Sequence, residues 1–236
     1  RPGLLFALFC KCRLFTNNYL FILIAVSLFS GCGPRKPLPN GDKDNGGLIL
    51  PGGFDAVVVA DSIGRARHIT VNDNGDIYVK LTYNDIMHGS GGTAAIRDND
   101  NDGKADIIAY FGDYKDEGGL PAGIRIHDGY LYTSTVKHIY RNKLTRSSLI
   151  PDSKTETIFT DTDSALFRHW HTAKPFTFDD NGNMYVPFGA PNDAAQDVNI
   201  AGAAGIPGGK GLDPAPELEI HAGIWRFDDA KTNQTQ

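Results

Sequence analysis

The chain has 236 residues, of which 41% are hydrophobic and 22% charged, and these proportions exclude a disordered tail, a collagen and a disulfide-stapled miniprotein. Its formal net charge of −5 argues against a nucleic-acid partner. The 27 glycines and 13 prolines make up about 17% of the chain, against roughly 12% in average proteins, and they favour many turns between short strands. The chain begins with arginine and ends directly after a strand-like run, which predicts a piece of a longer protein.

The first 31 residues have the pattern of an export signal. Eleven apolar or nearly apolar residues at 19–29 follow two basic residues, and this run is shorter than the roughly 20 residues of a membrane-spanning helix. The small residues before Cys32 resemble the bacterial lipobox, although Phe29 stands where that pattern prefers leucine. We therefore predict a lipoprotein-type signal peptide at 1–31 and lipidation of Cys32. Plain secretion and a short buried apolar segment are the alternatives.

Cysteine usage and charge support the same location. All three cysteines lie in the first 32 residues, so cleavage before Cys32 would leave a body that folds without a disulfide. That body would carry 20 basic and 28 acidic residues, so we expect it to contact the membrane only through its lipid anchor. Residues 32–53 have the proline, glycine and charge content of a flexible linker. The expected location is exported, periplasmic or at the cell surface, and anchored to a bacterial membrane.

A repeat of about 53 residues organises the remainder. An Asp/Asn-Gly turn that leads into an alternating strand occurs three times, and its tyrosines Tyr78, Tyr132 and Tyr185 are 54 and 53 residues apart. Another alternating run precedes each turn, and a third run with Ile and Arg follows it. Four short strands per unit at this period are typical of β-propeller blades.

The sequence thus predicts an all-β fold in which 54–236 form a partial propeller of four-stranded antiparallel blades, about three of an expected six. The three copies of the turn and strand are DNGDIYV at 73–79, HDGYLYT at 127–133 and DNGNMYV at 180–186. A β-sandwich of about eleven strands is the alternative, but it gives no reason for the regular spacing.

An acidic loop joins the third and fourth runs of the first unit. Its sequence, DNDNDGKAD, places carboxylates around a glycine, and such carboxylates can converge on one hard cation. The loop is not an EF-hand, since position 109 is alanine and no helices are expected beside it. A structural calcium site and a solvated acidic hairpin both remain open. The candidate ligands are Asp98, Asp100, Asp102 and Asp106.

Three segments together resemble the glucose/sorbosone dehydrogenases, and the sorbosone dehydrogenase branch most of all. They are HWHTAKPFTFDDNGNMYVPFGAPNDAAQD at 169–197, PELEIHAGIWRFDD at 216–229 and AAIRDNDNDGKADIIAYFGD at 94–113. The resemblance implies a six-bladed propeller that oxidises a sugar, an aldose or a sorbosone-like compound, by hydride transfer to pyrroloquinoline quinone (PQQ). It also implies a sugar substrate and an electron acceptor, a quinone or a cytochrome, as partners.

The resemblance assigns a general base and a substrate loop. In the family a histidine fourteen residues before the repeat tyrosine takes the hydroxyl proton, and position 171 is histidine. His169 is its rival for this role, and without the family a structural histidine is the plainer interpretation. An insertion from about 189 to 221 corresponds to the loop that lines the family's sugar pocket, and a loop without a ligand is the alternative. The residues that would contact substrate there are Asn192, Asp193 and Gln196.

The resemblance gives only a partial cofactor site. The segment before the second blade is similar to a turn from which a glutamine reaches PQQ in glucose-oxidising relatives, and the nearest residue here is Glu117. PQQ carries three carboxylates and needs several cations; Arg168 and Lys174 are candidates, although both are equally plausible as surface charges. Because the family draws most of these cations from later blades, we expect 1–236 alone to be inactive and the full-length protein to be active. A non-enzymatic propeller lipoprotein that binds carbohydrate or protein is the competing hypothesis.

Overall fold

A computed structural model describes residues 38–82, 92–112, 123–163, 171–189 and 223–235. Nearly all of them belong to one compact unit, Pro39–Gln236. Within the described ranges the elements are strands, apart from a single 3₁₀ turn, η1 (Asn45–Gly47). No helix in those ranges has the length and apolar content needed to span a membrane.

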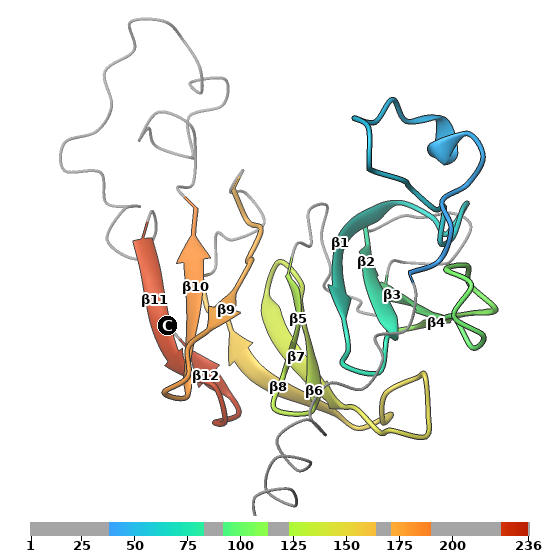
Figure 1. Ribbon diagram of the computed structural model, residues 1–236. Helices are drawn as coiled ribbons and strands as arrows, with labels where there is room; N and C mark the ends of the chain where they lie inside the picture. Colours follow the sequence, from blue (N-terminus) through green and yellow to red (C-terminus); the bar gives the residue numbers. More distant parts are fainter. Residues whose placement is uncertain (1–37, 83–91, 113–122, 164–170, 190–222, 236) are drawn as a thin grey trace, which may run out of the picture. The chain divides into compact units, whose positions relative to one another are not determined.

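The first sheet contains four antiparallel strands in chain order (Figure 1). They are β1 (Ala66–Val71), β2 (Ile77–Leu81), β3 (Gly92–Arg97) and β4 (Ile107–Phe111). Both faces of β2 and β3 are covered, since almost every residue in these two strands is buried. The outer strands β1 and β4 are largely exposed.

The second sheet repeats this meander and gains a fifth strand. β5 (Ile124–His127), β6 (Tyr130–Ser134), β7 (His138–Lys143) and β8 (Thr155–Thr160) pair antiparallel in chain order. The short β12 (Gln234–Thr235) then pairs parallel with β8. The repeat did not predict this pairing, because it joins segments that lie far apart in the sequence.

The third sheet contains β9 (Thr177–Phe178), β10 (Asn183–Phe188) and β11 (Gly223–Asp228), again antiparallel and in chain order. Burial in β10 alternates with the period of a strand whose one face is packed: Met184, Val186 and Phe188 are buried, and the residues between them are half-buried. The described strands therefore match the runs that the repeat predicted.

The turn between β5 and β6 shows why an Asp-Gly pair suits a two-residue hairpin. Asp128 has a φ of 45° and Gly129 a φ of 76°, so both central residues lie in the left-handed region. A two-residue hairpin of this twist requires positive φ at both positions, and Asp-Gly is among the sequences that tolerate it best. The turn thus sets the register of β5 against β6.

Apolar side chains connect neighbouring sheets in chain order. One cluster joins the first and second sheets through Tyr78, Ala95, Ile124 and Leu131, and a larger aromatic cluster joins the second and third through residues such as Phe159. Consecutive four-stranded meanders that pack face to face are the arrangement of propeller blades. The predicted fold class, all-β with antiparallel propeller blades, is confirmed.

Two of the three repeated tyrosines bond one sheet to the next. The hydroxyl of Tyr78 donates to the backbone oxygen of Leu149 at 2.9 Å, and the hydroxyl of Tyr132 donates to that of Asp229 at 3.0 Å; both bonds are buried. In the third sheet Tyr185 donates to a carboxylate of its own sheet, Asp179, at 3.0 Å. In the first two copies of the repeat, the tyrosine is thus a hydrogen-bonded connection between successive sheets.

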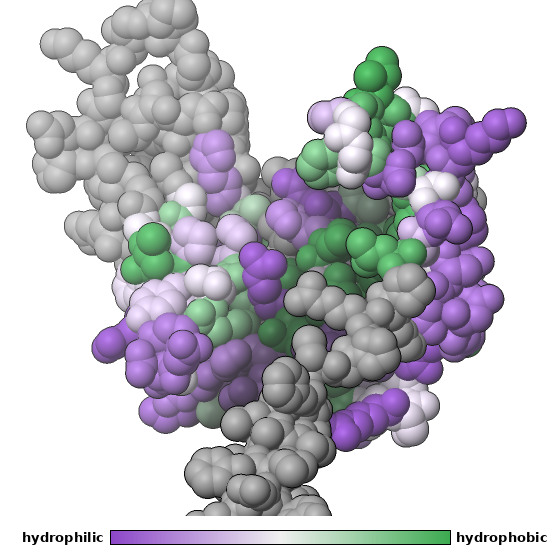
Figure 2. All heavy atoms as spheres, in the orientation of Figure 1, coloured by the Kyte–Doolittle hydropathy of each residue, from purple (hydrophilic) through white to green (hydrophobic). Residues whose placement is uncertain are grey.

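The segment before β1 contacts the first sheet. Asp42 accepts from Lys104 Nζ at 2.6 Å, and its backbone N–H donates to Ala56 at 2.7 Å. Several large apolar side chains of this segment are exposed, and Figure 2 shows green atoms over it at the upper right; they include Leu48, Ile49 and Phe54. The linker prediction for 32–53 overlaps this segment, and its boundaries stay a prediction.

Candidate functional site

His171, the predicted general base, lies on the segment that leads into β9 and is exposed. Gly189, the residue directly after β10, packs against it. A side chain at Gly189 would overlap Cβ of His171 and come within 2.6 Å of its backbone oxygen. Glycine at 189 is therefore required by this close approach, and the end of β10 holds the backbone of His171 in place.

Lys174, predicted to contact the cofactor, is buried in the contact between the second and third sheets. Its Nζ lies 2.8 Å from Asp161 Oδ2, donates to the backbone oxygen of Val136 at 2.5 Å and lies 5.3 Å from the ring centroid of Phe188. Burial lowers the pKa of Lys174, and the Asp161 carboxylate opposes that shift. This geometry directs the ammonium at protein groups, so we leave Lys174 out of the cofactor proposal below.

The acidic loop brings together three of its four candidate ligands. One carboxylate oxygen each from Asp98, Asp100 and Asp106 lies within 4.8 Å of the others. Asp102 instead accepts from the backbone N–H of Lys104 at 2.7 Å. Carboxylate oxygens at this spacing suit a hard cation such as Ca²⁺.

Backbone N–H groups already hold the central carboxylate of this loop. Asp98 accepts from Asn101 at 2.6 Å and from Gly103 at 2.9 Å. Desolvation raises the pKa of Asp98, but these bonds outweigh it and leave the pKa below its ordinary value. The carboxylate is thus ionised at neutral pH, as a cation ligand must be.

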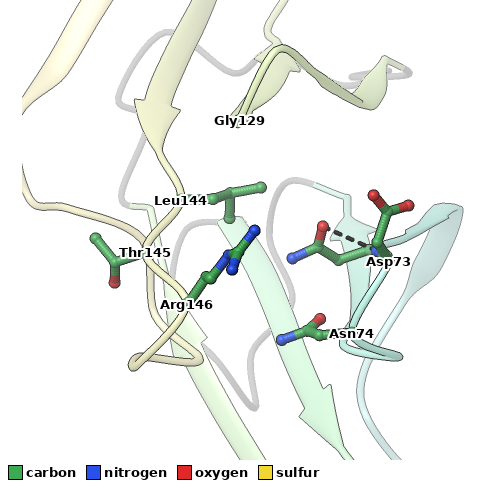
Figure 3. A pocket seen from close by; sticks show the side chains of 7 residues that line it. Asp73, Asn74, Gly129, Leu144, Thr145 and Arg146 are labelled. Atoms are coloured by element: carbon green, nitrogen blue, oxygen red, sulfur yellow. Dashed lines mark hydrogen bonds between the residues drawn. The ribbon is translucent and has the colours of Figure 1, made fainter. Parts of the chain in front are cut away.

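A cleft of about 600 Å³ lies where turns of the first and second sheets meet (Figure 3). Arg146 lies across it from Asp73 and Asn74, and none of the residues predicted for sugar oxidation lines it. Asn74 is already bonded within its own turn, where its Nδ2 donates to Asp76 at 2.8 Å. The cleft therefore gives no support to the predicted chemistry.

His127 belongs to none of the predicted sites. Among the described residues, it forms the shortest contact between titratable groups of two different sheets. Nε2 of His127, in the second sheet, lies 2.7 Å from Oδ2 of Asp229, which directly follows β11 in the third. The HDG turn motif contained this histidine, but nothing in the motif indicates a partner 102 residues away.

The remaining predicted residues lie outside the described ranges. They are the lipidation site Cys32, the cofactor contacts Glu117 and Arg168, and the substrate contacts Asn192, Asp193 and Gln196. His169, the rival general base, lies outside them as well. Their predicted roles stay predictions.

Comparison with solved structures identifies two similar folds. A calcium structure of a family AA12 carbohydrate-active enzyme from Trichoderma reesei matches with a TM-score of 0.51 at 15% identity, over 77% of this chain and 40% of that one. The holo form of the pyranose dehydrogenase PQQ domain from Coprinopsis cinerea matches with a TM-score of 0.49 at 15% identity, over 70% of this chain and 36% of that one. No family model and no curated protein matches the sequence.

The likeness to the AA12 enzyme shows the fold. The chain spans about two fifths of the length of the structures it matches. A likeness over this part of their length does not give the activity of a whole protein.

Proposed function

We propose that this chain is part of a PQQ-dependent enzyme that oxidises a sugar, an aldose or a sorbosone-like compound. Two independent observations support the proposal. Three segments of the sequence resemble the glucose/sorbosone dehydrogenases. The stacked sheets share their fold with an enzyme that acts on carbohydrates. The sorbosone branch is part of the proposal and rests on the sequence alone.

One observation of the structure carries the proposal. The segment 190–222, which contains the predicted substrate contacts, begins directly after Gly189, and Gly189 packs against His171. A general base must lie within hydrogen-bond reach of the hydroxyl whose proton it takes. The contact between Gly189 and His171 supports the proposal, because the predicted substrate loop follows Gly189 in the sequence.

The role proposed for this chain is proton transfer. An exposed imidazole at position 171 would accept the proton of a sugar hydroxyl as a general base and then release it to water. PQQ, when bound, would supply the oxidising quinone. Lys174, the one described residue predicted to contact PQQ, does not fit a cradle for the cofactor's three carboxylates, because its ammonium faces Asp161. We therefore assign no PQQ contact to the described residues.

Calcium belongs to the proposal as a structural ion. Asp98, Asp100 and Asp106 would hold it where β3 is joined to β4, far along the chain from His171. An ion there would stabilise the loop and take no part in sugar oxidation.

The test is dye-linked turnover of the complete protein that contains this chain. Sugar-dependent reduction of 2,6-dichlorophenolindophenol would be measured with PQQ and Ca²⁺ present, over a panel of aldoses and sorbosone. His171→Ala should lower kcat by about 10²-fold or more while PQQ still binds in an absorbance titration. His169→Ala tests the rival base, and His68→Ala, at an exposed histidine of β1, is the matched control.

The outcomes separate the alternatives. Unchanged turnover in His171→Ala would reject the base, and loss of turnover in His169→Ala alone would transfer the role. A complete protein that binds sugar but neither binds PQQ nor turns over would support the carbohydrate-binding lipoprotein instead. We also propose that residues 1–236 alone are inactive; turnover by this chain with added PQQ and Ca²⁺ would refute that.

The exported, lipid-anchored location is a further part of the proposal. Its support is the apolar run at 19–29 and the small residues before Cys32. Metabolic labelling with a radioactive fatty acid in a bacterial host should label the wild-type protein and leave Cys32→Ser unlabelled. Equal labelling of both would refute anchoring at this cysteine.

A further inference from the structure

Two sheets meet at a histidine and an aspartate whose positions are fixed from several sides. His127 ends β5, and its ring stacks on Phe178 of β9 with centroids 4.1 Å apart and planes 2° from parallel. The backbone N–H of Asp229 donates to Gly182 at 3.1 Å, and its backbone oxygen accepts from the Tyr132 hydroxyl at 3.0 Å. These contacts hold Nε2 of His127 and Oδ2 of Asp229 2.7 Å apart.

A second carboxylate is directed to the same place by the β5–β6 turn. Asp128 is the left-handed residue of that turn, and its Oδ2 lies 3.7 Å from Nε2 of His127. Its side chain is 84% exposed, so it can rotate, whereas the side chains of His127 and Asp229 are only 20% and 12% exposed. Ligand atoms of all three residues lie within 4.8 Å of one another.

These separations fit a small divalent cation bound by nitrogen and oxygen. Zinc lies at about 2.0–2.2 Å from such atoms, so two ligands of a tetrahedral zinc ion stand roughly 3.4 Å apart. The observed separations of 2.7 Å and 3.7 Å lie on either side of that value. Rotation of the exposed Asp128 side chain and a small opening of the His127–Asp229 contact would bring the ligand atoms of all three residues to tetrahedral spacing.

The donor set also distinguishes this cluster from the acidic loop. The loop offers only carboxylate oxygens, which suit calcium, whereas an imidazole nitrogen with two carboxylates suits zinc and its neighbours in the first transition series. Arg141 is a cation beside this cluster; its Nη1 donates to the backbone oxygen of Asp229 at 3.3 Å, and its Nε pairs with Glu156 at 2.9 Å. That guanidinium is directed at these partners and leaves the Asp229 carboxylate to His127.

We propose that His127, Asp128 and Asp229 bind a divalent transition-metal ion of the zinc type. Because the ligands come from the second and third sheets, the bound ion would cross-link the two. Three protein ligands leave a fourth tetrahedral position for water. The proposal concerns a site apart from His171 and does not depend on sugar oxidation.

The test uses Co²⁺ as a spectroscopic substitute and Zn²⁺ as the ligand, on the chain without a histidine tag and after removal of metals by a chelator. One equivalent of Co²⁺ should give visible d–d bands, which an equivalent of Zn²⁺ then abolishes. Asp128→Asn should weaken Zn²⁺ binding at least about tenfold, since it removes one ligand from an exposed turn that asparagine also tolerates. Asp73→Asn, an exposed carboxylate in the corresponding turn of the first sheet, is the matched control and should bind like the wild type.

A stability measurement gives a second readout. Zn²⁺ in excess should raise the Tm of the wild type and of Asp73→Asn, because a ligand that binds only the folded state stabilises it. The same Zn²⁺ concentration should raise the Tm of Asp128→Asn and of His127→Gln by clearly less than that of the wild type. The proposal is wrong if no bands appear, or if Asp128→Asn binds Zn²⁺ as tightly as the wild type. If His127→Gln fails to fold, the Zn²⁺ affinity of Asp128→Asn still tests the proposed site.

Discussion

Removing the hydroxyl of Tyr78 tests whether the repeated tyrosine connects one sheet to the next. Tyr78→Phe keeps the ring, which packs edge-on against Phe111 with centroids 6.3 Å apart, and deletes only the group that donates to Leu149 at 2.9 Å. Tyr78 is fully buried and Leu149 is 7% exposed, so the carbonyl would be left without its partner and away from water. Such a loss costs about 1–3 kcal/mol of the free energy of unfolding.

The two other repeat tyrosines provide graded comparisons. Tyr132→Phe also removes the acceptor of a 3.2 Å bond from Arg141 Nη1, but that nitrogen and the Asp229 carbonyl still bond to each other at 3.3 Å, so the variant should cost less, about 0.5–1.5 kcal/mol. Tyr185→Phe should change the free energy of unfolding by less than about 0.5 kcal/mol, since its half-buried hydroxyl bonds only within its own sheet. The expected order of destabilisation is therefore Tyr78, Tyr132, Tyr185.

The assay is equilibrium urea unfolding of the three variants at pH 7, followed by circular dichroism. A second series at high pH checks the same bond, because burial raises the pKa of Tyr78 to about 12 from 10.0. A raised pKa means that this group stabilises the fold below pH 10 and that its contribution is lost as the pH rises through about 12. Tyr78→Phe should lack that part of the alkaline loss. Equal destabilisation by Tyr78→Phe and Tyr185→Phe would refute the reasoning.

Three further predictions concern Asp179, Lys174 and Gly189, which flank the strands of the third sheet. The side-chain amide of Asn183 and neighbouring N–H groups lower the pKa of Asp179 from 3.8 to about 2, so thermal melts of the wild type should lose stability as the pH falls from about 4 to 2, and Asp179→Asn should lose less. Lys174→Met should cost about 3–5 kcal/mol in urea unfolding, because it removes the cation beside the fully buried carboxylate of Asp161, and adding Asp161→Leu should restore most of it. Gly189→Ala should lower the Tm, since overpacking a tight contact costs about 1–3 kcal/mol; an unchanged Tm would mean that this approach is loose.

The fold could be predicted in detail because its signals are local. An Asp-Gly pair requires particular backbone angles within two residues, and alternation of apolar side chains expresses strand geometry over five or six. The repeat therefore predicted the strands from β1 to β11 and their division into sheets. It could not predict β12, whose pairing with β8 depends on how two sheets lie in space.

The candidate site was only partly predictable for the same reason. The sequence identified the acidic loop, where three of four carboxylates converge, because all of its ligands lie within nine residues. It predicted His171 as the base only by resemblance, and that role stays a prediction. The contact of Gly189 with His171 is visible only in three dimensions. From the sequence, Lys174 was a candidate cofactor contact, whereas packing of the second sheet on the third buries that ammonium against Asp161.

The sequence by itself determined the class of fold and the positions of the strands from β1 to β11, because backbone preference and alternation act between near neighbours in the chain. The tertiary structure alone decided which side chains of different sheets face each other. The pairing of His127 with Asp229, 102 residues apart, is of this second kind. The strands of a sheet can be predicted from their own residues. A contact between sheets depends on the packing of both faces at once, and no local sequence pattern predicts that packing.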